Sequence, residues 1–222
     1  QPISVGSYKA NDGFIKEYQR LIKEVVIPYQ YKVLCDEIED TEKSHVMKNF
    51  INAANVLKGE DAGDGFYGMV FQDSDAAKWL EAVAYSLSVF PDAELEKTAD
   101  DFIDIIEAAQ DEDGYLNTYY TIKDKDKRWT NILEGHELYC SGHMMEAAVA
   151  YCEATGKDKF LYKYLTVSTA GWYTFEIDLD TLGDDNKTAD IACGLGYSSF
   201  DNLPSSCIIQ SEQAGEHVPL AR

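Results

Sequence analysis

The chain has 222 residues, of which 45% are hydrophobic and 27% are charged, so it is long enough to bury a core and too apolar to be disordered throughout. Its 19 basic and 40 acidic residues give a net charge of −21, which repels nucleic acid and anionic membranes. No apolar run approaches the roughly 18 residues of a membrane helix. We expect a neutral partner such as a sugar or oligosaccharide, no nucleic acid and no membrane. The simpler explanation, that the acidity only keeps the protein soluble, stays open.

The cysteines do not suggest a disulfide framework. Their number is odd, no CxxC pair occurs, and they are widely spaced: Cys35, Cys140, Cys152, Cys193 and Cys207. This favours a reducing compartment, so we expect a cytoplasmic protein. The chain opens at Gln1-Pro2 rather than at Met, and we expect that a segment preceded it. If that segment was a leader, the protein is periplasmic or secreted.

Helical periodicity dominates roughly the first 160 residues. Apolar residues recur at helical spacing over 14–26, and Pro28 is expected to kink or break that helix. Ser74 or Asp75 is expected to cap one of the later helices, and Gly156 to end the last. The later segments with helical spacing are 29–38, 46–57, 75–90, 91–109 and 142–154.

The chain changes character beyond the helices. Residues 111–135 are predicted to be irregular, and residues 173–179 alternate apolar and polar side chains as a strand does. The sequence therefore predicts a mainly α-helical fold of paired helices over 1–162. A divergent tail, 163–222, is predicted to be short and irregular or β-like.

Segment 135–143 is the richest in groups able to bind a ligand. His136 and His143 are two of the four histidines of the chain, and Glu137 lies between them. The HExxH zinc motif fails because Cys140 stands where its second histidine belongs. A His136–Cys140 pair would need a helix to hold a soft metal, and the two glycines that bracket the segment argue against a helix. Neutral donors and acceptors of this kind suit a polyol, whereas the plainer alternative is two hydrogen-bonded core histidines.

Two further segments carry candidate residues. Asp75 either stabilises a helix start, with Lys78 as an ion-pair partner, or shapes a pocket. Tyr115 follows the Asp113-Gly114 turn in an aromatic loop, which either forms a platform for a sugar or fills the core. Many glycosidases use two carboxylates roughly 5–10 Å apart, but the sequence does not show whether any pair meets that distance.

In this order, these segments resemble the start of the catalytic domain of glycoside hydrolase family 127, the β-L-arabinofuranosidases. The resemblance extends over about two thirds of the chain and ends soon after Leu161. The stretches that carry it are Asp12-Gly13-Phe14, Asp73-Ser74-Asp75 with Lys78-Trp79-Leu80-Glu81-Ala82, Ala109-Gln110 to Asn117-Thr118, Arg128-Trp129-Thr130-Asn131, His136 to His143, Glu146 to Ala150, and Ala154-Thr155-Gly156-Lys157.

The resemblance implies an (α/α)6 toroid, retaining hydrolysis of terminal β-L-arabinofuranosides, and a zinc-bound cysteine thiolate as nucleophile. In the family one Glu and three Cys bind the zinc, and a separate Glu is the acid/base. The resemblance also implies that His136 or His143 hydrogen-bonds sugar hydroxyls, with Glu137, Asp75 and Tyr115 as further substrate-binding residues. Zinc is thus expected from the family, but its ligands and the catalytic residues are not found in this chain, which has no adjacent cysteine pair.

The resemblance leaves the status of the chain as an enzyme open. A twelve-helix toroid needs roughly 300 residues, and this sequence supplies about six helices, so the first hypothesis is an incomplete glycosidase domain. Part of a toroid would expose its apolar inner ring, so we expect a second copy or a missing chain segment to cover it. The alternatives are a non-catalytic carbohydrate-binding helical protein and a toroid glycosidase that acts on another glycan.

Overall fold

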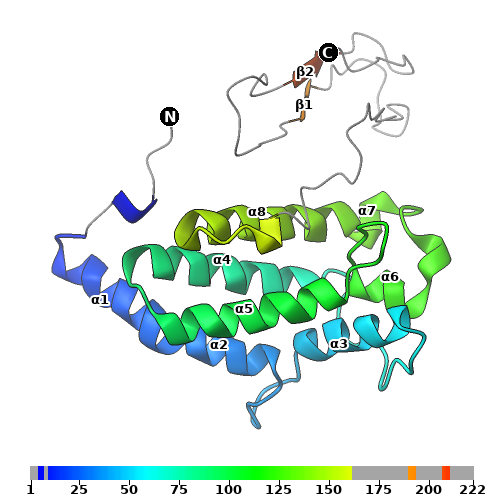
Figure 1. Cartoon of the computed structure of the whole chain (residues 1–222), viewed down its shortest axis with the longest axis horizontal. Coiled ribbons are helices and arrows are strands. Elements are labelled where there is room, and N and C mark those ends of the chain that lie inside the picture. The colour runs from blue at the N-terminus through cyan, green and yellow to red at the C-terminus, as the bar shows by residue number, and fades with distance from the viewer. Residues whose placement is uncertain (1–4, 8–9, 162–189, 194–206, 211–222) are drawn as a thin grey trace. The chain divides into compact units, whose positions relative to one another are not determined.

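The computed structural model describes residues 5–7, 10–161, 190–193 and 207–210, and divides the chain into two units (Figure 1). The first unit, Gln1–Thr166, is helical wherever it is described with regular structure, and the second is Val167–Arg222. In the second unit, β1 (Asp190–Cys193) pairs antiparallel with β2 (Cys207–Gln210), with Asp190 opposite Gln210. The strand predicted over 173–179 lies outside the described residues.

Eight α-helices are described in the first unit, which confirms the prediction of a helical fold for these residues. None of the helices described is both long and apolar enough to cross a membrane. With two 3-10 turns and one π-helical turn, the elements are η1 Val5–Ser7, α1 Gly13–Leu21, η2 (π) Ile22–Val26, α2 Ile27–Leu34, α3 Val46–Leu57, α4 Asp73–Val89, α5 Ala93–Ala108, α6 Thr118–Lys123, η3 Lys125–Lys127, α7 Ile132–Gly135 and α8 Glu137–Thr155.

Pro28 was expected to kink or break the helix, and the structure shows no break there. A proline has no N–H to donate and its ring clashes with the carbonyl four residues earlier, which is why a break was expected. Here the chain passes through a π-helical turn, in which Ile27 N–H donates to the carbonyl of Ile22, five residues back. Pro28 then falls in the first turn of α2, where its missing donor costs little.

Other boundaries also differ from expectation. Residues 111–135 are not wholly irregular, because the short helices α6 and α7 lie within them. The last helix begins at Glu137 rather than near 142, so it runs through Gly142. The cap predicted at Ser74 or Asp75 is wrong, because α4 already begins at Asp73 and its N-cap residue Gln72 makes no side-chain cap. The predicted helix 46–57 is confirmed by α3.

The core of the helical unit lies around α4, which packs against α8, α2 and α5 (Figure 1). Fully buried alanines on both α4 and α8 are small side chains that let helices approach closely. Trp79 is also buried on α4, and its Nε1 donates to the Ile27 carbonyl at 3.0 Å, which joins α4 to α2. The alanines are Ala76, Ala77 and Ala84 on α4 and Ala147 and Ala148 on α8.

Candidate functional site

The first turns of α8 carry a cluster of imidazole and phenol rings, which we call the imidazole cluster: His136, Tyr139 and His143. Tyr139 lies between the two histidines, with ring centroids 5.9 Å from His136 and 4.6 Å from His143 and nearly perpendicular planes. For Tyr139 and His143 this follows from the helix, because residues four positions apart share one face, whereas His136 is the N-cap residue directly before α8. Tyr139 is exposed, and the two histidines are half-buried.

Phe71, just before α4, and Lys78, within α4, extend the imidazole cluster. The Phe71 ring lies 5.1 Å from the His136 ring, and Lys78 Nζ lies 5.3 Å from the centre of the Tyr139 ring. Lys78 also lies 3.8 Å from a carboxylate oxygen of Asp75, a half-buried residue whose pKa is raised mainly by burial. Rings, a cation and a carboxylate therefore line one surface between α4 and α8.

The hydrogen bond of His136 shows which of its ring nitrogens carries the proton. Its Nδ1 lies 2.7 Å from the carbonyl oxygen of Glu134, and a carbonyl only accepts. Nδ1 therefore carries the proton, and in the neutral imidazole Nε2 is left as an acceptor. His136 itself has a left-handed backbone, with φ of 52°. His143 Nδ1 lies 3.4 Å from Glu146 Oε2, which forms an ion pair only when the imidazole is protonated.

Glu137 is directed away from solvent, and only 2% of it is exposed. Its carboxylate accepts the Trp129 N–H at 3.0 and 2.9 Å and the hydroxyl of Tyr115. Burial, followed by the hydrogen bond to Glu137, raises the pKa of Tyr115, so the phenol stays a donor. The structure thus brings the predicted residues Glu137 and Tyr115 together, with each other as partners.

The loop before α8 is held to the same network. Asp111 forms ion pairs with Lys125 at 2.6 Å and Arg128 at 2.9 Å, and its pKa is lowered to about 2, chiefly by the hydrogen bond from Lys125. The Arg128 guanidinium lies 3.9 Å from the centre of the Tyr115 ring. The Glu137 carboxylate therefore joins this loop to the first turn of α8, and the Arg128 guanidinium, stacked on Tyr115, strengthens the connection.

Asp73, the first residue of α4, is a second buried carboxylate. Asp73 accepts both the backbone N–H and the hydroxyl of Thr118, which joins the start of α4 to the start of α6. Burial raises the Asp73 pKa to about 6, against the effect of these hydrogen bonds. Burial and the Asp73 charge together raise the pKa of the Cys140 thiol to about 12, so this cysteine is protonated at neutral pH.

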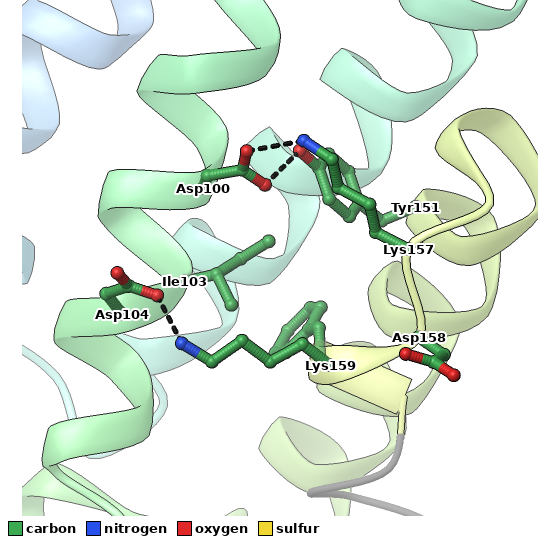
Figure 2. A pocket seen from close by; sticks show the side chains of 8 residues that line it. Asp100, Ile103, Asp104, Tyr151, Lys157, Asp158 and Lys159 are labelled. Carbon is green, nitrogen blue, oxygen red and sulfur yellow. Dashed lines mark hydrogen bonds and ion pairs between the residues drawn. The ribbon is translucent and has the colours of Figure 1, made fainter.

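Two pockets lie elsewhere in the described part of the chain. One, of about 320 Å³, lies between α5 and the end of α8, where Lys157 and Lys159 reach the carboxylates of α5 (Figure 2). The other, of about 380 Å³, lies along α1, beside the exposed side chains of Phe14 and Tyr18. None of the five predicted site residues lines either of them, and direct contact of those five with a ligand stays a prediction.

The described residues do not fit the zinc site that the family implies. No group of three His, Cys, Asp or Glu side chains among them is arranged to hold a metal ion. The described thiols Cys35, Cys140 and Cys152 are unpaired by disulfides, and burial raises the pKa of each, which disfavours the thiolate that zinc binds. No role for zinc is assigned to these residues.

Comparison with known proteins decides the family. The family described as "Beta-L-arabinofuranosidase, GH127 catalytic domain" matches residues 7–199, a span that continues well past Leu161. The chain belongs to glycoside hydrolase family 127. It is 44% identical, over 164 residues, to a non-reducing end β-L-arabinofuranosidase of Bifidobacterium longum subsp. longum, a match that covers 67% of this chain and 24% of that protein.

Solved structures of the family agree. A GH127 β-L-arabinofuranosidase from Geobacillus stearothermophilus T6 is 56% identical with a TM-score of 0.66, over 70% of this chain and 24% of that one. A GH127 β-arabinofuranosidase is 31% identical with a TM-score of 0.62, over 74% of this chain and 26% of that one. The chain thus spans about a quarter of the length of these family members.

Several residues of the surface were not predicted as site residues. Phe71, Lys78 and Tyr139 lie against the predicted histidines, and Trp129 lies on the Glu137 carboxylate. Tyr139 is three residues after His136 and four before His143. Its role was hidden because the segment was expected not to be helical, and the helix supplies the signal. Trp129 had no periodic signal, since its place depends on a loop.

Proposed function

We propose that this chain supplies one wall of the sugar-binding pocket of a β-L-arabinofuranosidase domain. The wall consists of the imidazole cluster with Phe71, Lys78 and Asp75. The observation that carries the proposal is the free acceptor at His136 Nε2, oriented by the Nδ1 contact to Glu134 and flanked by aromatic rings. Such a site offers a sugar hydroxyl an acceptor and offers the apolar face of a sugar an aromatic ring.

In this proposal, hydrolysis requires the complete catalytic domain. Retaining hydrolysis of terminal β-L-arabinofuranosides needs a nucleophile and an acid/base, and the described thiols are protonated rather than activated. Asp75 and the two histidines then bind and orient the sugar. Glu137 and Tyr115 position the binding residues, because their polar atoms already hold each other and the Trp129 N–H.

The helices are proposed to be part of an (α/α)6 toroid. Two features support this: the helices pack as neighbouring pairs, and the chain superposes on family members about four times its length. An apolar stripe on α1, η2 and α2 also faces solvent, as expected for a wall whose neighbours are missing. It consists of Phe14, Tyr18, Leu21, Val25 and Tyr29.

Calorimetry with L-arabinose and arabino-oligosaccharides tests the sugar site. We expect His136→Asn to weaken binding roughly tenfold, which corresponds to one lost hydrogen bond of about 1.4 kcal/mol. Asparagine is the right replacement because it tolerates the left-handed backbone. The matched control is His45→Asn, since His45 has φ of 55° and lies in the α2–α3 loop. Equal affinity of the two variants would contradict the proposal.

Turnover of p-nitrophenyl β-L-arabinofuranoside with added zinc tests whether hydrolysis requires more than this chain. We expect no turnover by the 222-residue chain. Turnover that a chelator abolishes would show that the residues of the chemistry are present in this chain. A non-catalytic carbohydrate-binding protein is the second candidate, favoured by the raised pKa of every described thiol. Binding without turnover in a chain extended to the length of its relatives would select it.

A further inference from the structure

Trp129 has a backbone conformation that a large side chain rarely adopts. Its φ is 62°, in the left-handed region that non-glycine residues avoid because the Cβ approaches the backbone. Such a conformation costs free energy, and it persists only where surrounding contacts hold it in place.

Trp129 is held by a buried carboxylate and by a buried phenol ring. Its N–H donates to both oxygens of the Glu137 carboxylate, at 3.0 and 2.9 Å. The indole packs edge-on against the Tyr115 ring, with centroids 5.4 Å apart and planes at 88°, and Tyr115 in turn donates to Glu137. Arg128 covers the Tyr115 ring at 3.9 Å. Glu137 and Tyr115 therefore set the position and direction of the indole, and Arg128 helps to hold Tyr115.

This support does not serve to bury the indole. Trp129 remains 48% exposed, whereas Trp79 on α4 is 3% exposed. A tryptophan that only filled the core would resemble Trp79. The buried carboxylate instead holds Trp129 in a strained backbone conformation that leaves the indole partly exposed to water. The side chains of Ile132 and Leu133, close by in the sequence, are also exposed. An exposed apolar ring in a fixed orientation is a feature of binding surfaces.

The place of the ring is also informative. Glu137, which holds the Trp129 backbone, directly follows His136 and begins α8. The strained residue is therefore fixed at the turn from which the imidazole cluster extends. An indole face binds C–H groups and needs no opposite charge, so it suits a neutral sugar in a strongly acidic protein.

We propose that Trp129 is a carbohydrate-stacking residue, whose indole binds the apolar face of a sugar ring next to the ring held at His136. The inference rests on the proposed function and adds to it a second subsite. Its ligand is an oligosaccharide or an extended glycoside, because the indole binds a second sugar ring beyond the one held at His136.

The test compares an arabinofuranose disaccharide with methyl β-L-arabinofuranoside by calorimetry, on the full chain. Trp129→Ala keeps the Cβ and so the same backbone strain, and we expect it to weaken disaccharide binding roughly tenfold and monosaccharide binding less than about threefold. Trp129→Phe keeps a ring and should fall between. Tyr29→Ala is the matched control, because Tyr29 is 49% exposed and lies on α2.

The outcomes separate this inference from the proposed function. If His136→Asn weakens binding and Trp129→Ala does not, the second subsite is absent while the sugar site stands. If the parent chain binds neither sugar, both fail. Should Trp129→Ala not fold, Trp129→Phe carries the test through tryptophan fluorescence. A disaccharide-dependent change in emission that keeps its full size after this substitution would overturn the inference, because the whole signal would then come from the other two tryptophans of the chain.

Discussion

The two ends of α8 are both fixed by charged side chains, in opposite ways. At the first turn a single carboxylate, Glu137, is 2% exposed and accepts from Trp129 and Tyr115. After the last turn Lys157 and Lys159 reach the carboxylates of α5, and these lysine side chains stay 42% and 55% exposed (Figure 2). Each lysine has two acidic partners within 2.7 Å.

The end with fewer charged groups is expected to be the more strongly fixed. An exposed ion pair gains little, because water and salt screen it and ordering two long side chains costs entropy. A buried acceptor is different, since its removal leaves buried donors without a partner. The comparison therefore predicts that one substitution at the first turn outweighs both lysines at the last.

The largest expected effect is that of Glu137→Ala. It removes the acceptor of the buried Tyr115 hydroxyl and of the part-buried Trp129 N–H, and we expect the free energy of unfolding to fall by about 3 kcal/mol in urea titrations. Glu153→Ala is the control, because Glu153 lies exposed on the same helix and should cost less than about 0.5 kcal/mol. Similar losses from the two variants would remove the basis of the comparison between the ends of α8.

Asp73 gives a pH-dependent effect of similar size. Its folded pKa of about 6 lies above its ordinary value of 3.8, so folding favours its protonated form. The stabilisation is complete below about pH 4 and is lost as the pH rises through about 6, an effect on the order of 3 kcal/mol. Unfolding should be followed from pH 4 to 7 for the parent chain and for Asp73→Asn. We expect the difference between them to change over this window, and a constant difference would contradict the prediction.

The longer helices of the first unit were largely predictable, because apolar side chains recur in them at helical spacing and, in α3, α4, α5 and α8, are buried in the core. The prediction for α3 was right to the residue, and Asp92 caps α5 by accepting from Leu95 N–H. The π-helical turn before Pro28 was not predictable from period alone. It depends on how α2 docks on Trp79, which is 52 positions away in sequence.

The sequence predicted which residues gather in the candidate site, but it did not predict how they are arranged. The histidines of segment 135–143 are brought together on one face of α8, but Gly135 and Gly142 were taken as breaks in a helix. A glycine has a second use, which is close packing. A Cβ on Gly135 would lie 2.4 Å from the hydroxyl of Tyr120, a contact that no local pattern reveals.

That contact gives the next prediction. Gly135→Ala should cost about 2 kcal/mol, because the new methyl group and the Tyr120 hydroxyl cannot both fit. Tyr120→Phe removes the hydroxyl, so in that background Gly135→Ala should cost less than about 1 kcal/mol. The double-mutant cycle is measured by thermal or urea unfolding. If the two effects simply add, the glycine is not there for the close approach.

The smallest effect is expected where α8 ends. Lys159 lies 2.6 Å from Asp104 and 2.7 Å from Glu107, and these hydrogen bonds raise its pKa, yet more than half of its side chain is exposed. We expect Lys159→Ala to cost less than about 1 kcal/mol at low salt. In about 0.5 M NaCl the cost should shrink further, because the Debye length falls below about 5 Å. Glu137→Ala should keep its effect in the same salt, since a buried acceptor is not screened. If salt weakened both variants equally, burial would not be what distinguishes the two ends of the helix.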